Sequence, residues 1–204
     1  MEAWLTASPW PGVILWVILY TSDYYLTIYS ARGFRGIGHF QFEGSLELTP
    51  QFQKEVDALK PVSSLHLTYL VVYSLAIFLI FWITRLASYF HWTYSLFLGM
   101  FLLVEVSVHL RHFRNISMIR EYQKGGGIEG QISYRKWYTY RISAHELFAH
   151  AALFIFVAVL SFSVFFLGGA IMCFATGLSH LKLARKAKQN VTAPTVVSGD
   201  KDTT

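Results

Sequence analysis

The sequence predicts an all-α integral membrane protein, built as an antiparallel bundle of four transmembrane helices. The first observation is composition: 54% of the 204 residues are hydrophobic and 14% are charged, whereas soluble domains carry about 25% charged residues. The second is that the charges cluster, and the stretches between clusters are long enough to cross a hydrocarbon core of about 30 Å. A chain of this length accommodates one domain. We therefore expect one transmembrane domain over residues 1–188 and a disordered polar tail over residues 189–204.

The four spans follow from the apolar stretches and the residues that bound them. The first is expected at residues 11–30, where Pro11 suits the first turn of a helix. The second is expected at 63–84 and the third at 92–112, each bordered by proline or basic residues. The fourth, at 143–178, is longer than one crossing needs, so we expect it to tilt or to project from the bilayer.

The segments outside the spans add one further element. In the first loop, Thr49-Pro50 followed by QFQKEVDAL predicts a capped, short amphipathic helix. The N-terminus lacks the basic start and the small-residue cleavage site of a signal peptide, so we expect a retained first helix and no cleaved signal. Glycines 168, 169 and 177 should let a second helix, of this chain or of another subunit, approach the fourth span closely.

The basic residues bear on partners and on orientation. The net charge of +5 does not indicate nucleic-acid binding, because Lys and Arg flank the apolar stretches as they do in membrane proteins. The side that carries loops 31–62 and 113–142, called side B, holds most of them. The KLARKAK cluster at residues 182–188 is expected on the opposite side, side A, so the positive-inside rule favours a cytoplasmic side B only weakly. The lipid bilayer is the expected partner, and the plasma membrane the expected location.

Ionisable residues inside the expected spans are the main candidates for function, because burying them in a membrane is costly. An antiparallel bundle places the end of the first and third spans and the start of the second and fourth on side B. Seven ionisable residues then lie at a similar depth near that side, while the side-A half is nearly free of charge. They are Asp23, His66, Glu105, His109, His112, Glu146 and His150.

Spacing among these residues favours a metal site. Glu105 and His109 are separated by four residues, which places them on one helix face, and Glu146 and His150 repeat that spacing on the fourth span. Helical bundles build carboxylate and histidine metal sites in this manner, so these four are the predicted ligands. The donor set suits Zn, Fe or Mn, and suits haem less. The alternative is a network of hydrogen bonds and ion pairs that only ties helices together.

The remaining polar residues receive supporting roles. Asp23 and His112 are predicted catalytic groups, with Asp23 able to activate a metal-bound water. His66 is predicted to relay protons or to orient a ligand. Three arginines near side B are predicted to bind phosphate or lipid headgroups. They are Arg111, Arg114 and Arg141.

Three functions fit this polar half. The first is a metal-binding protein, or a metalloenzyme, that acts on a lipid-like substrate at side B. The second is a subunit of a homo-oligomeric ion or proton channel, with Asp23, Glu105 and Glu146 along the pathway. The third is a structural or accessory subunit of a membrane complex. Whether the protein is an enzyme stays open at this point.

Overall fold

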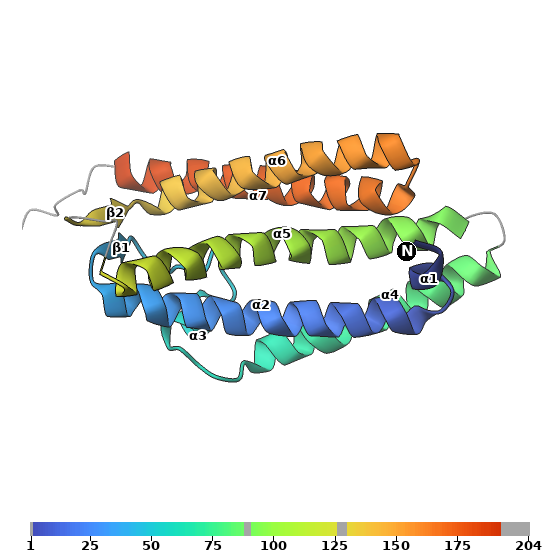
Figure 1. The fold of residues 1–204 in the computed structure, drawn as a ribbon, viewed down its shortest axis with the longest axis horizontal. Helices are drawn as coiled ribbons and strands as arrows, with labels where there is room; N and C mark the ends of the chain where they lie inside the picture. The colour runs from blue at the N-terminus through green and yellow to red at the C-terminus, as the bar shows by residue number, and fades with distance from the viewer. Residues whose placement is uncertain (1, 88–90, 126–129, 193–204) are drawn as a thin grey trace, which may run out of the picture.

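A computed structural model describes residues 2–87, 91–125 and 130–192, and 81% of the structure is helical. Most of the predicted tail lies outside the described residues. Five long helices lie side by side along the longest axis of the molecule (Figure 1). The elements in chain order are α1 (Glu2–Thr6), α2 (Pro9–Ile37), β1 (Phe40–Phe42), α3 (Gln53–Asp57), α4 (Ser64–Leu86), α5 (His91–Gln123), β2 (Ile132–Tyr134), α6 (Lys136–Ser161) and α7 (Val164–Thr192).

Four of the described helices are long and apolar enough to cross a membrane, which supports the predicted class of membrane protein. They are Ser64–Leu86, Trp92–Gln123, Lys136–Ser161 and Val164–Asn190. Helix α2, which contains the predicted first span, is not among them, although its 29 residues extend for about 40 Å. It nevertheless lies inside the bundle: α7 packs on α6 and α5, α5 packs on α2, and α2 packs on α4 (Figure 1).

The predicted fourth span, 143–178, differs in the structure because it contains parts of two helices. Helix α6 ends where Phe162 adopts a left-handed backbone with φ 51°, and the amide groups of Phe162 and Ser163 donate to the carbonyl of Ala158. A side chain with a Cβ adopts this conformation at a cost, and the extensive packing of α6 on α7 offsets it. No Gly or Pro marks this turn in the sequence, so the apolar pattern reads as continuous.

The turn returns the end of α7 to side B. His180 of α7 hydrogen-bonds Ser143 near the start of α6, with 2.9 Å between Nδ1 and Oγ. Nearby, the Lys188 ammonium lies 5.5 Å from the centre of the Trp137 ring. The basic cluster at 182–188 is therefore on side B and not on side A. Among the described residues, every Lys and Arg except Arg85 now lies in the side-B half.

Short elements close side B. The predicted amphipathic helix is present as α3, whose Val56 is 1% exposed and packs against α2. Strand β1 pairs in parallel with β2, with Phe40 opposite Ile132, so the two side-B loops are hydrogen-bonded to each other.

Side A is closed by direct contact between helix backbones. A Cβ atom on Gly99 of α5 would lie 1.9 Å from the carbonyl oxygen of Phe165 in α7. A Cβ atom on Gly168 would lie 2.0 Å from the carbonyl oxygen of Leu96. The predicted close approach at the α7 glycines is confirmed, because Gly169 meets Leu103 and Gly177 meets Phe148. The partner helices belong to this chain.

Candidate functional site

A cavity of about 650 Å³ lies in the side-B half, between α2, α4, α5 and the α6–α7 pair, with the first loop against it. Aromatic side chains line it toward side A and again beneath the β1–β2 pair, and a polar belt lies between these two regions. The aromatic residues toward side A include Trp16, Tyr20, Tyr73 and Phe101. The charged residues and histidines of the belt are Asp23, Glu47, His66, Glu105, Arg111, His112, Arg114, Glu146 and His180.

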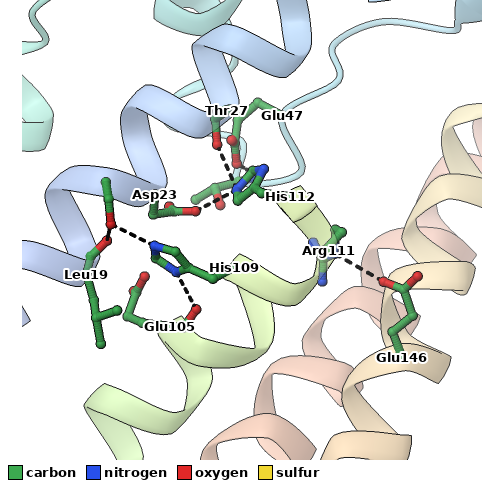
Figure 2. Close-up of polar contacts among 11 residues, drawn as sticks. Leu19, Asp23, Thr27, Glu47, Glu105, His109, Arg111, His112 and Glu146 are labelled. Atoms are coloured by element: carbon green, nitrogen blue, oxygen red, sulfur yellow. Dashed lines mark hydrogen bonds and ion pairs between the residues drawn. The ribbon is translucent and has the colours of Figure 1, made fainter. Parts of the chain in front are cut away.

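The two predicted catalytic residues contact each other in this belt. His112 Nε2 lies 2.7 Å from Asp23 Oδ1 and 3.3 Å from Thr27 Oγ1 (Figure 2). Because an ionised carboxylate can only accept a hydrogen bond, the proton of the imidazole resides on Nε2. A neutral His112 then has Nδ1 as its basic nitrogen. The pair therefore joins a carboxylate, an imidazole of defined tautomer and a basic nitrogen at the cavity.

Glu146, a predicted metal ligand, is bound by two arginines instead. Its Oε2 accepts from Arg111 Nε at 3.1 Å, and its Oε1 accepts from Arg114 Nη1 (Figure 2 shows the first pair). Side-chain exposures of 17% for Arg111 and 22% for Glu146 exclude most water from this contact, which strengthens it. The Glu146 carboxylate therefore forms ion pairs with both guanidinium groups.

Several side chains that line the cavity carry a polar atom without a partner. Glu105 is 9% exposed and His66 is 7% exposed. Four buried atoms from cavity-lining side chains make no hydrogen bond within the described part of the chain. They are Trp16 Nε1, His66 Nε2, Glu105 Oε2 and His112 Nδ1. Since buried polar atoms are nearly always hydrogen-bonded in folded proteins, such a concentration at one cavity requires an explanation.

The other two predicted ligands lie outside the belt. His109 accepts from or donates to Ser22 Oγ at 2.7 Å through Nε2, and its Nδ1 donates to the Glu105 carbonyl at 2.8 Å. It lines a shallow groove between α2 and α5, and its ring centre lies 6.5 Å from that of His112. His150 lies near Phe154, with 6.4 Å between the ring centres.

The metal-binding prediction is therefore not supported. In residues 2–87, 91–125 and 130–192, no three His, Cys, Asp or Glu side chains are grouped so that they could hold a metal ion. The physical reason lies in the helix period. Residues four apart differ by about 40° and residues seven apart by about 20° in the opposite sense. The His109 ring is therefore directed at Ser22 of α2, whereas Glu105 and His112 line the cavity.

Two belt residues were missed from the sequence. Glu47 comes from the first loop, and His180 comes from the part of α7 expected on side A. Burial raises the pKa of the Glu47 carboxyl above its ordinary value of 4.5, the Thr49 amide opposes this, and the Asp23 carboxylate adds to it. No local pattern marks a loop carboxylate that tertiary contacts bury. Arg141, a predicted headgroup ligand, is exposed and does not line the cavity.

No protein-family model, curated protein or solved structure matches this chain. The function therefore has to be inferred from the geometry of the belt.

Proposed function

We propose that this protein binds an amphiphilic molecule in the side-B cavity, with the polar end of the molecule at the belt and its apolar part along the Trp16 and Phe101 side chains. One observation carries the proposal: four buried polar atoms without partners belong to side chains that line one cavity, whose remaining walls are largely aromatic and aliphatic. Small-molecule sites combine apolar walls with a few polar groups that fix orientation. Polar atoms that lack partners within the protein are suited to hydrogen-bond such a ligand.

The Asp23–His112 pair extends this proposal to acid–base chemistry. His112 Nδ1 would take a proton from a hydroxyl or ammonium group of the ligand, and Asp23 would stabilise the imidazolium that forms. The return of the proton from Nδ1 completes the cycle. The channel and accessory-subunit functions stay predictions, because nothing observed favours either of them over a binding site.

Filling the cavity tests the proposal. Val104 lines the cavity, whereas Val106, two residues further along α5, is 37% exposed on the outer surface of the bundle. We expect lipids co-purified with the wild type, or an added fluorescent amphiphile, to be lost from Val104→Phe and retained by Val106→Phe. The measurement is mass spectrometry of extracts together with a binding titration in nanodiscs. Equal binding by wild type and both variants would contradict the proposal.

We also propose that side B faces the cytoplasm. The α6–α7 turn moves the 182–188 cluster to side B, so only Arg85 among the described basic residues is left near side A. Positive charges near helix ends are retained on the cytoplasmic side.

Single cysteines test this orientation in a Cys173→Ala background, since Cys173 is the chain's one cysteine and is fully buried. Ser161→Cys at side A should react with an impermeant maleimide in intact cells, and Lys124→Cys should react only after lysis. Both positions are exposed, so accessibility to solvent is matched. The reverse pattern would refute a cytoplasmic side B.

A further inference from the structure

We infer that the polar end of the bound amphiphile is a cation, an alkyl amine or a quaternary ammonium group. The inference rests on the proposed function, since it concerns the same cavity, and it narrows the ligand class. It follows from three features of the belt: the way its charges pair, a buried carboxylate without a partner, and the aromatic rings that surround it.

The pairing of charges leaves the cavity with an excess of carboxylates. Arg111 and Arg114 both bind Glu146, which offsets one of their two charges. The remaining acidic side chains that line the cavity are Asp23, Glu47 and Glu105. Of these, Asp23 is bonded to His112, and Glu47 accepts from its own loop at Thr49. A phosphate or carboxylate headgroup would meet these three carboxylates, whereas a cation would be attracted by them.

Glu105 is the position at which a cation would bind. Its carboxyl is nine-tenths buried, lines the cavity and has no partner for Oε2 anywhere in the described ranges. Asp23 acts electrostatically on Glu105, so these two acidic side chains lie within range of each other. A buried carboxyl without a partner is costly to ionise, and an organic cation beside it would stabilise the ionised form.

Aromatic side chains line the same cavity as this carboxylate. Trp16 of α2 makes edge contacts with Tyr73 of α4 and Phe101 of α5, with 5.5 Å between ring centres in each case. Tyr20 stacks on His66 at 4.4 Å. All these residues line the same cavity. Aromatic rings attract ammonium groups through their quadrupoles, most strongly where water is excluded, and they also pack against alkyl substituents on the nitrogen. A quaternary ammonium group therefore matches both the rings and the carboxylates.

Three octyl compounds that differ only in the headgroup test the inference: octyltrimethylammonium, octanol and octyl phosphate. Binding is measured in nanodiscs by the quenching of tryptophan fluorescence, with empty nanodiscs and Val104→Phe as controls for partition into lipid. We expect octyltrimethylammonium to bind at least about tenfold more tightly than the other two compounds. Glu105→Gln should remove this preference while octanol binding persists. Val106→Phe serves as the variant that leaves the cavity open.

The outcomes separate the two proposals. Octanol that binds as tightly as the cation, or octyl phosphate that binds more tightly, overturns the inference and leaves the proposed binding site intact. If none of the three binds beyond the level of Val104→Phe, both proposals fail. If Glu105→Gln does not fold, the comparison of the three compounds on the wild type still decides the ligand's charge, and Asp23→Asn then reports the contribution of a carboxylate.

Discussion

The two halves of the bundle hold an acidic side chain in opposite ways, a half-buried one on side A and a buried one on side B. On side A, Glu2 of α1 accepts from Ser163 at 2.6 Å and from Ser95, so both of its oxygens have partners. On side B, Oε2 of Glu105 has no partner within the described chain. The helices around Glu2 are in backbone contact, whereas those around Glu105 enclose a cavity. The first carboxylate is therefore bonded within the fold, whereas Oε2 of the second is left without a partner in the described chain.

The same two helices create this contrast. Helices α5 and α7 meet through Gly99 and Gly168 near side A, where a Cβ atom would collide with the opposite backbone. Toward side B they carry Glu105, Arg111 and His180, whose longer polar side chains line the cavity with the other helices. Close backbone packing near side A and a cavity near side B therefore occur along the same pair of helices.

The largest expected effect follows from filling the contact on side A. Gly99→Leu should abolish folding or lower the free energy of unfolding by about 3 kcal/mol or more, because the Phe165 carbonyl occupies the space of the added atoms. Thermal unfolding in detergent, followed by circular dichroism, measures this loss. Gly36→Ala on α2 is the control, since no atom lies within 4 Å of its added Cβ. If Gly99→Leu were as stable as Gly36→Ala, the close backbone contact between α5 and α7 near side A would not depend on the absence of a side chain at Gly99.

Next in size is the exchange of each carboxylate for an amide. Glu2→Gln should lower stability by about 1–3 kcal/mol, because two charge-assisted hydrogen bonds are weakened. Glu105→Gln should not lower the melting temperature of the ligand-free protein, because Oε2 of Glu105 has no hydrogen bond to lose. Melting temperatures of the two variants in one detergent measure the contrast. Destabilisation of equal size by both would indicate that Glu105 also has a structural role.

A smaller effect is expected at Glu47 and depends on pH. Burial raises the pKa of its carboxyl above 4.5 in the folded protein, with Asp23 and Arg111 as the other charged groups that act on it. The folded state therefore holds the proton more tightly than the unfolded chain, so stability falls as pH rises from about 4.5 through the raised pKa. Melting curves across this window should show that decline in the wild type and a weaker one in Glu47→Gln. Identical pH profiles would contradict the assignment.

The smallest effect is expected at the outer groove, which tests whether that side of α5 takes part in binding. Ser22→Ala removes the hydrogen bond to His109 and should cost about 0.6 kcal/mol, as interhelical hydrogen bonds in membranes typically do. Binding of octyltrimethylammonium should not change, because Ser22 and His109 do not line the cavity. Parallel melting and binding titrations give both values, and a large loss of binding would extend the site to the groove.

Part of the site could be predicted from the sequence because depth in an antiparallel bundle follows from position along each helix. Asp23, His66, Glu105, His112 and Glu146 were placed at one level by this reasoning, and all five line the cavity. Which atoms bond to which could not be predicted in the same way. The Arg111–Glu146 and Asp23–His112 contacts join residues 35 and 89 positions apart, and they depend on the rotation of whole helices.

The sequence by itself determined that the chain belongs in a membrane, that its ionisable groups concentrate in one half, and that small residues on α7 permit close packing. These properties follow from composition, from spacing and from residue size, which act locally. Only the tertiary structure decided that the last apolar stretch turns back at Phe162, and that His109 and His150 lie apart from the belt. That turn lacks Gly or Pro and depends on α6–α7 packing, and a rotation of some tens of degrees decides which side of a helix contact a side chain occupies.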